Sequence, residues 1–232
     1  MQITLNHATP LHICSNSIRQ CWQSQDKSDT EHELIPLIHA ESGEDMSYSM
    51  TSCGPVDRAL IDRIGNKFKH ASTLEHLSYN FTIEGVSRAL LQELSRHRMA
   101  SLSVKSTRYT LAELKDESSF HLSDGCYDHN RGERYLVYTN DIDIDEMSIK
   151  ALENLRILLR DGKSNDIAKY CLPESYKTSL SWTINARSLQ NFLALRSSKA
   201  ALWEIRDLAQ AIFDSLPEDH KYLFEHCLSE EH

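Results

Sequence analysis

Basic and hydroxyl side chains are concentrated between Arg96 and Tyr109, where the sequence reads RHRMASLSVKSTRY. The basic residues are Arg96, His97, Arg98, Lys105 and Arg108. Arginine can hold a phosphate or a carbonyl edge through two parallel hydrogen bonds, and hydroxyl groups can donate to the same oxygens. The hydroxyl donors are Ser101, Ser103, Ser106 and Thr107. The segment therefore indicates a phosphate or nucleotide site.

A second interpretation of the basic segment is that its cations offset a helix dipole or are simply solvated. The net charge of the whole chain limits the kinds of ligand that this protein can bind. The 232-residue chain has 25 Lys+Arg against 34 Asp+Glu, a net charge of −9, which disfavours a protein that lies along nucleic acid. Any anion site must therefore depend on local positive charge.

Glycine, cysteine and histidine spacing excludes several common sites. The 7 glycines are never closer than seven residues apart, so neither G-x-G-x-x-G nor a P-loop occurs. The 6 cysteines include no C-x-x-C pair, and the 12 histidines include no H-E-x-x-H motif. We therefore expect no disulfide framework and no metal site.

Length and composition predict one globular domain over residues 1–232, with surface insertions at 23–33 and 115–145. Its 40% hydrophobic and 25% charged residues are typical of such a domain. The chain has no apolar run near the roughly 20 residues of a membrane span, and its N-terminus has no signal-peptide pattern. We therefore expect a cytoplasmic protein without a membrane partner.

The elements before the basic segment can be predicted from periodicity. Apolar residues at helical spacing after Pro55 predict an amphipathic helix that leads to the loop HASTLEH, residues 70–76. Alternation over 77–83 predicts a half-buried strand ended by Gly85. Ser87 should cap a helix whose C-terminal end carries residues 96–98. The basic segment itself should be extended over 101–109.

The elements after it complete an α+β order. We expect helices over 146–160 and 165–171, then a strand over 179–184 that runs into a turn at 185–188. Two further helices, 189–196 and 199–216, close the chain. This order favours a mixed or antiparallel sheet flanked by helices, because strands and helices do not alternate regularly.

Three separated motifs resemble those of the flavin-dependent thymidylate synthases. Arg96-His97-Arg98, seven intervening residues and Ser106 resemble the R-H-R-x7-S signature, and Arg108-Tyr109 continues it. HASTLEH upstream and WTINARSLQNFLALR, residues 182–196, also resemble family segments. The match covers roughly residues 55–109 and 165–216. The family's α+β fold is therefore expected.

The resemblance implies an activity and its ligands. Members make dTMP from dUMP with methylenetetrahydrofolate, and NAD(P)H supplies hydride through bound FAD. They are homotetramers whose active sites are shared between subunits. FAD would then bind outside a Rossmann crevice, in agreement with the missing glycine fingerprint. No nucleic acid partner is implied.

The resemblance also assigns site residues by position. The flavin contacts would be His70, Ser72, Glu75, Arg96, His97, Arg98, Asn185, Ala186, Arg187 and Asn191. The dUMP contacts would be Gln92, Glu93, Arg96, Val104, Lys105, Ser106, Thr107, Arg108, Lys169 and Arg196. Arg96 and Arg108 suit the phosphate, while Arg196 would stabilise negative charge on the pyrimidine. Ser106 has no activating base nearby in sequence, so we expect it to bind and polarise dUMP rather than attack it.

Departures from the family pattern keep alternatives open. Leu102-Ser103-Val104 stands where many members have x-Asn-Glu, Glu93 stands at a frequent glutamine position, and Lys169 replaces an arginine. These changes motivate a nucleotide-binding homologue that has lost catalysis. A further alternative is a metal-dependent nucleotide hydrolase that uses His70, His76 and His97.

Overall fold

The protein is built on a four-stranded antiparallel sheet, which the computed structural model describes together with the rest of residues 1–36, 47–123 and 125–229. The strand order is β1 (Gln2–Ala8), β4 (Ser78–Ser87), β6 (Lys177–Asn185) and β5 (Ala100–Val104). All three pairings are antiparallel, and the strand order places β5 at one edge. The predicted α+β class with an antiparallel sheet is confirmed.

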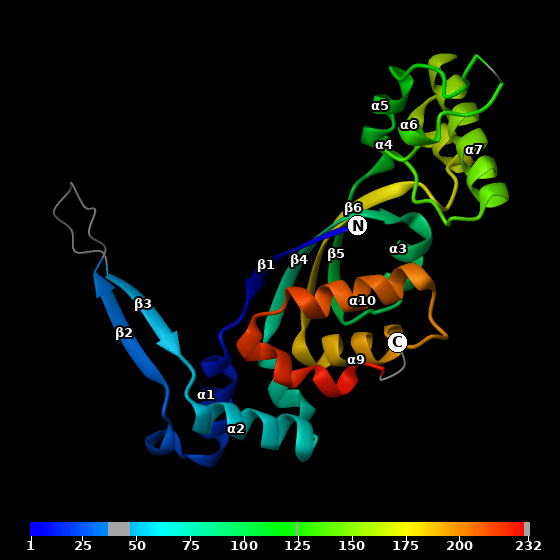
Figure 1. Cartoon of the computed structure of the whole chain (residues 1–232). Helices are drawn as coiled ribbons and strands as arrows, with labels where there is room; N and C mark the ends of the chain where they lie inside the picture. The colour runs from blue at the N-terminus through cyan, green and yellow to red at the C-terminus, as the bar shows by residue number, and fades with distance from the viewer. Residues whose placement is uncertain (37–46, 124, 230–232) are drawn as a thin grey trace, which may run out of the picture.

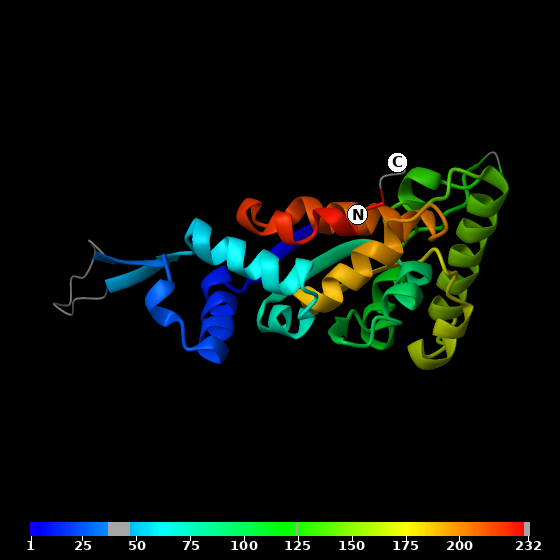
Figure 2. The same cartoon turned by 90° about the horizontal axis from the view of Figure 1, so that it is seen from below.

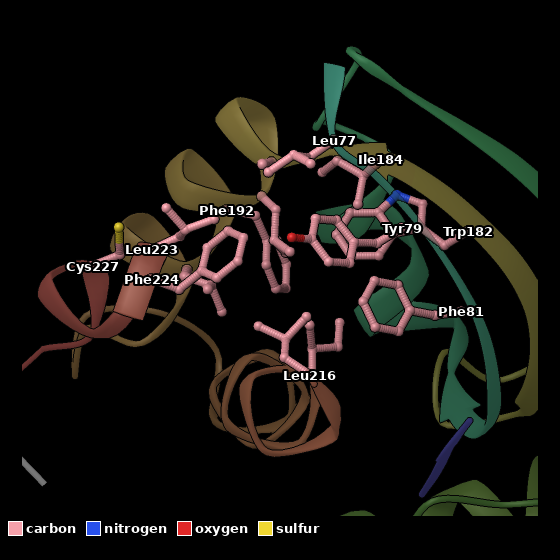
Figure 3. Packing of buried hydrophobic residues seen from close by; sticks show 14 of the residues in the cluster. Leu77, Tyr79, Phe81, Trp182, Ile184, Phe192, Leu216, Leu223, Phe224 and Cys227 are labelled. Carbon is pink, nitrogen blue, oxygen red and sulfur yellow. The ribbon is translucent and has the colours of Figure 1, made fainter. Parts of the chain in front are cut away.

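One face of this sheet forms the main core. Tyr79, Phe81 and Trp182 are buried there beneath two helices, α9 (Ala186–Arg196) and α10 (Trp203–Ser215) (Figures 1 and 3). The aromatic rings of Trp182 and Phe192 meet edge to face with centroids 5.0 Å apart. The opposite face carries half-buried or exposed serine, threonine and asparagine, as the alternating pattern predicts.

The helices next to the sheet largely follow the predictions. α2 (Pro55–Ile61) continues as a π-helix, η2 (Asp62–Lys67), and HASTLEH forms the 3₁₀ helix η3 (Ala71–His76). The Ser87 hydroxyl accepts from the Leu90 N–H and caps α3 (Arg88–Leu94), which confirms the expected cap. The C-terminal region ends in two 3₁₀ helices, η5 (Glu218–Leu223) and η6 (Glu225–Cys227).

Several predicted boundaries are wrong. The helices expected to begin at residues 146 and 199 begin at Ile142 and Trp203. β4 does not end at Gly85, because this residue takes φ 71° in a bulge and the strand continues to Ser87. The segment 101–109 is extended only to Val104 and then forms α4 (Thr107–Thr110). Asn185 is not a turn residue, since its carboxamide oxygen accepts from the Ser188 N–H and starts α9 directly after β6.

Residues 115–145 contribute to a second packed cluster. Phe120 and Leu136 are buried against the long helix α7 (Ile142–Arg160), together with α5 (Ala112–Lys115) and α6 (His129–Gly132). α8 (Asn165–Ala168) and the 3₁₀ helix η4 (Lys169–Cys171) return the chain to β6. The sequence shows this region only as polar, because its core is assembled from short elements with little periodicity.

The N-terminal region holds elements that periodicity does not reveal. β1 and α1 (Leu11–Trp22) pack with the main core, and the 3₁₀ helix η1 (Gln25–Lys27) leads to the hairpin β2 (Glu31–Pro36) and β3 (Ser47–Ser52). Part of the predicted insertion 23–33 is thus a strand. Seen from below, the hairpin and α7 lie at opposite ends of an elongated molecule (Figure 2). None of the helices in the described ranges is both long and apolar enough to span a membrane.

Segment 28–30 is fastened to the start of α2 by buried polar contacts. The Asp57 carboxylate, which is fully buried, accepts hydrogen bonds from Arg19 Nε at 2.6 Å, Ser28 Oγ at 2.6 Å and Thr30 Oγ1 at 2.5 Å. Asp29 accepts from the Asp57 N–H at 2.9 Å and so satisfies one of the free donors at the helix start. This network joins α1, the segment that precedes β2, and α2.

Candidate active site

A groove of about 940 Å³ opens between η3, the segment that follows α3, and α9. Eight predicted ligand contacts line it, from segments far apart in sequence: Glu75, Arg96, His97, Arg98, Asn185, Arg187, Asn191 and Arg196. Among the lining residues that the structure describes, four arginines face one glutamate. The groove therefore concentrates positive charge on a chain of net charge −9.

Arg196 is held at the C-terminal end of α9 by contacts to two other site residues. Its Nη1 lies 2.7 Å from Glu93 Oε2, and its Nη2 donates to the Glu93 carbonyl at 3.2 Å. Its Nε donates to His97 Nε2 at 3.0 Å. The side chain is 16% exposed. The guanidinium is thus oriented before any ligand binds, which reduces the entropic cost of using it.

His97 lies between the groove and the core. Burial lowers the pKa of His97, and the neighbouring Arg196 charge lowers it further. The ring is therefore neutral at pH 7, as its role as acceptor from Arg196 requires. It also meets the Phe192 ring edge to face at 5.1 Å, so the core fixes the orientation of the imidazole.

The other wall of the groove is formed by the start of α9 and by η3. Arg187 Nη1 lies 2.7 Å from Glu75 Oε1, and both side chains are about half exposed. The pair links the HASTLEH segment to the first turn of α9. An ion pair this exposed adds little stability. Both groups therefore remain available to a ligand.

Some predicted contacts lie beside the groove rather than along it. His70 and Ser72 are exposed in and next to η3. Ala186 is buried, and its N–H donates to the Leu77 carbonyl at 2.8 Å, so it lies beneath the surface. Gln92 lines an adjoining hollow of about 500 Å³ together with Glu93 and Arg196.

The remaining predicted dUMP contacts lie at the far end of β5: Val104, Lys105, Ser106, Thr107, Arg108 and Lys169. Ala100 and Val104 bound β5, and a strand of this length places its ends roughly 13 Å apart. Arg108 Nε lies 2.7 Å from Asp166 Oδ1, and the Asn165 carboxamide donates to the Arg108 carbonyl at 2.7 Å. Lys105 lines a separate hollow of about 270 Å³. A single chain therefore does not bring the two groups together.

Several residues of the groove are not predicted from the sequence. Met99, which is 74% exposed, lies directly after the basic triplet, and Ser188, Leu195, Ala200 and Ala201 complete the lining. The position of Met99 directly after the basic triplet is the only sequence signal among them, and the others show no pattern. In the described part of the chain, no three His, Cys, Asp or Glu side chains cluster as metal ligands, so nothing there favours the hydrolase alternative.

The fold and the groove define an α+β protein with a positively charged groove, at one end of its sheet, that suits a large anionic ligand. Comparison with known proteins identifies the family. Residues 4–220 match the model of the Thy1 family, described as thymidylate synthase complementing protein. The chain belongs to this family, whose similar curated members are flavin-dependent thymidylate synthases.

Individual relatives match over nearly the full chain. The flavin-dependent thymidylate synthase of Wolinella succinogenes is 57% identical over 231 residues, 100% of each chain. That of Campylobacter jejuni is 56% identical over 228 residues, 98% of each. The crystal structure of thymidylate synthase X from Helicobacter pylori with FAD and dUMP has a TM-score of 0.85 at 52% identity, covering 99% of this chain and 100% of that one. The family and fold predicted from three motifs are confirmed.

Proposed function

We propose that this chain makes dTMP from dUMP by reductive methylation, with methylenetetrahydrofolate as carbon donor and NAD(P)H-reduced FAD as hydride carrier. The observation that carries the proposal is the groove, where residues of the three motifs meet around four arginines. The Helicobacter pylori relative, whose structure was solved with FAD and dUMP, supports the same ligands here.

The residues of the groove suit FAD. Its volume of about 940 Å³ is at the upper end of the usual range for ligand sites. Arg98 and Arg187 can hold a pyrophosphate through paired hydrogen bonds, and Asn191 offers an amide to the flavin ring. When bound, FAD supplies the hydride transfer for which no side chain has the chemistry. His70 and Ser72 would add contacts at the margin, whereas the buried Ala186 would support the start of α9 from beneath.

The dUMP site needs residues from both ends of β5. Arg96 and Arg108 would hold the phosphate, and Arg196 would stabilise negative charge on the pyrimidine as it is reduced. One chain separates these groups, which supports a homotetramer with active sites shared between subunits. Lys169, Lys105 and the backbone of residues 104–107 would complete the phosphate end. We place the reaction in the cytoplasm, without nucleic acid or membrane partners.

An absorbance spectrum and an activity assay together test the proposed function. The purified protein is expected to be yellow and to release tritium from [5-³H]dUMP only when both NADPH and methylenetetrahydrofolate are present. Binding of dUMP by a colourless protein that releases no tritium would instead identify an inactive nucleotide-binding homologue. Loss of tritium release on chelation of metals would favour a metal-dependent enzyme.

Replacement of Ser106 by alanine is expected to lower the rate of tritium release about 10- to 100-fold without abolishing it, since one hydrogen bond to an anionic ligand is lost. Ser106 precedes α4 and is exposed, and no described histidine or carboxylate hydrogen-bonds to its hydroxyl. Ser164→Ala is the matched control, because Ser164 also precedes a short helix without a side-chain cap. Complete loss of activity with dUMP binding intact would contradict this role.

A further inference from the structure

Glu204 is a buried carboxylate to which the proposed reaction gives no role. It lies in the first turn of α10 and is 3% exposed. One of its oxygens accepts from the Ser87 N–H at 2.7 Å, and the Ser87 hydroxyl donates to the other. Within the described ranges Glu204 makes no ion pair, so these hydrogen bonds and the N-terminus of α10 must compensate for its burial.

This contact fixes the start of the short helix α3. The Ser87 hydroxyl also accepts from the Leu90 N–H at 2.9 Å, so Glu204 reaches the first turn of α3 through Ser87. The next free donors, the N–H groups of residues 88 and 89, donate to carbonyls of segment 174–176 at 3.1 and 3.0 Å. A helix of 7 residues has little stability alone, so these outside contacts decide where α3 lies.

The other end of α3 delivers two residues that contact Arg196. Glu93 lies in the last turn of α3, and His97 follows shortly after the helix ends. Both contact the Arg196 guanidinium, Glu93 at 2.7 Å and His97 at 3.0 Å. A shift of α3 along or away from α9 would therefore change both contacts at once.

The start of α10 also holds the chain that follows Arg196. α10 packs beside α9 (Figure 1), and a loop of only a few residues joins the two helices. Arg206, near the start of α10, donates from Nη1 to the Lys199 carbonyl in this loop at 2.9 Å. One turn of α10 thus connects to both partners in the site, to α3 through Glu204 and to the end of α9 through Arg206.

We propose that Glu204 is a positioning residue for the reaction. Through Ser87 it sets the position of α3, and α3 in turn places Glu93 and His97 against Arg196. Because Glu204 is almost completely buried, it acts through these contacts and does not touch the ligand. The inference rests on the proposed function for the role of Arg196 toward the pyrimidine.

A general contribution to stability is the competing interpretation, and Asp145 provides a matched control for it. Asp145 is also a buried carboxylate in the first turn of a helix, and it accepts from the N–H and the hydroxyl of Thr139 at 2.8 and 3.0 Å. Its helix, α7, contributes no residue to the described lining of the groove. Glu204→Gln and Asp145→Asn each replace one acceptor oxygen by an amide donor, so both should lower the urea midpoint of unfolding.

An NMR titration of His97 in the protein without flavin separates the two interpretations. Burial and the Arg196 charge lower the pKa of His97, and both effects weaken if α3 moves away from α9. Glu93 moves together with His97 and continues to raise this pKa. Glu204→Gln is therefore expected to raise the His97 pKa, whereas Asp145→Asn should leave it unchanged. The resonance is identified by its absence from His97→Gln.

The same pair of variants gives a kinetic readout. Glu204→Gln is expected to lower the rate of tritium release about 10- to 100-fold, because a small displacement of a positioned group is costly to catalysis. Asp145→Asn should release tritium at the unaltered rate. Ser87→Ala is a second variant, which removes the connecting hydroxyl and keeps Glu204. Its effect on the His97 pKa should have the same direction, and the double variant should show less than the sum of the two shifts.

An unchanged His97 pKa in folded Glu204→Gln or Ser87→Ala would overturn the proposal. So would an equal shift in Asp145→Asn, or tritium release by Glu204→Gln at the unaltered rate. The titration requires neither flavin nor turnover, so it tests the positioning of His97 even if the unaltered chain releases no tritium. That last result would refute the proposed function instead.

Discussion

Arg196→Ala is expected to lower the rate of tritium release from dUMP about 100- to 1,000-fold, the usual effect of removing a preorganised charge from an active site. The substitution removes the cation proposed to face the pyrimidine. It also leaves Glu93 and His97 without the contacts at 2.7 Å and 3.0 Å that Arg196 now makes. Arg196→Lys keeps the positive charge, but an ammonium group cannot contact both partners as the planar guanidinium does. This variant should therefore rescue activity only in part.

A spectroscopic readout separates this role from a general loss of structure. Because the Arg196 charge contributes to the lowered pKa of His97, Arg196→Ala should move that pKa upward in an NMR titration of the imidazole. Burial remains the larger cause, so the rise should be incomplete. Arg160→Ala, at the exposed end of α7, is the control and should change neither rate nor pKa. Full activity of Arg196→Ala would refute the assignment.

Asp57→Ala is expected to destabilise the protein by about 3–5 kcal/mol, the usual cost of removing one partner of a buried ion pair. Asp57 and Arg19 are 0% and 4% exposed, so the substitution leaves a buried guanidinium without its counter-charge. Ser28 and Thr30 lose their acceptor at the same time. Urea unfolding, followed by circular dichroism, measures the change in the free energy of unfolding.

The pH dependence of stability should change in the same variant. Burial alone would raise the Asp57 pKa, but hydrogen bonds from Ser28, Thr30 and Arg19 hold it below the usual 3.8. The carboxylate therefore stabilises the fold above that value, and this contribution is lost as pH falls through the lowered pKa. Asp57→Ala should lack this part of the acid transition. Asp166→Ala, at an exposed carboxylate, should unfold like the unaltered chain, and equal stability of both variants would contradict the prediction.

The sequence predicts those elements whose burial is periodic. β4 and β6 alternate over most of their length, and α3 has a clear cap, so all three are found to within a few residues. β1 offers only Ile3, Leu5 and Ala8 as partly buried residues that pack against the core, too few to separate a strand from a loop. The cluster around Phe120 depends on tertiary contacts between short helices, which no local pattern encodes.

The candidate site can be predicted from the sequence about as far as the fold can. Three motifs identify most of the groove, because each keeps its spacing along one element. The contact between Glu93 and Arg196 joins residues 103 positions apart, so sequence alone cannot assign Glu93 its partner. The sequence also does not show how far apart Arg98 and Ser106 lie, because residues 96–109 form one continuous basic run in it. In the structure, β5 lies between the two residues and separates them. Sequence proximity was therefore a poor guide to which residues share a ligand.

The ion pair between Arg108 and Asp166 has a consequence for substrate choice. In the protein without ligand, the Asp166 carboxylate already contacts the guanidinium of Arg108, which we propose to hold the phosphate. Both side chains are 58% exposed, so a phosphate can displace Asp166 from Arg108 at little cost in stability. The phosphate offers the arginine a doubly charged partner in exchange, whereas a nucleoside without its phosphate offers none and would leave the Arg108–Asp166 pair intact.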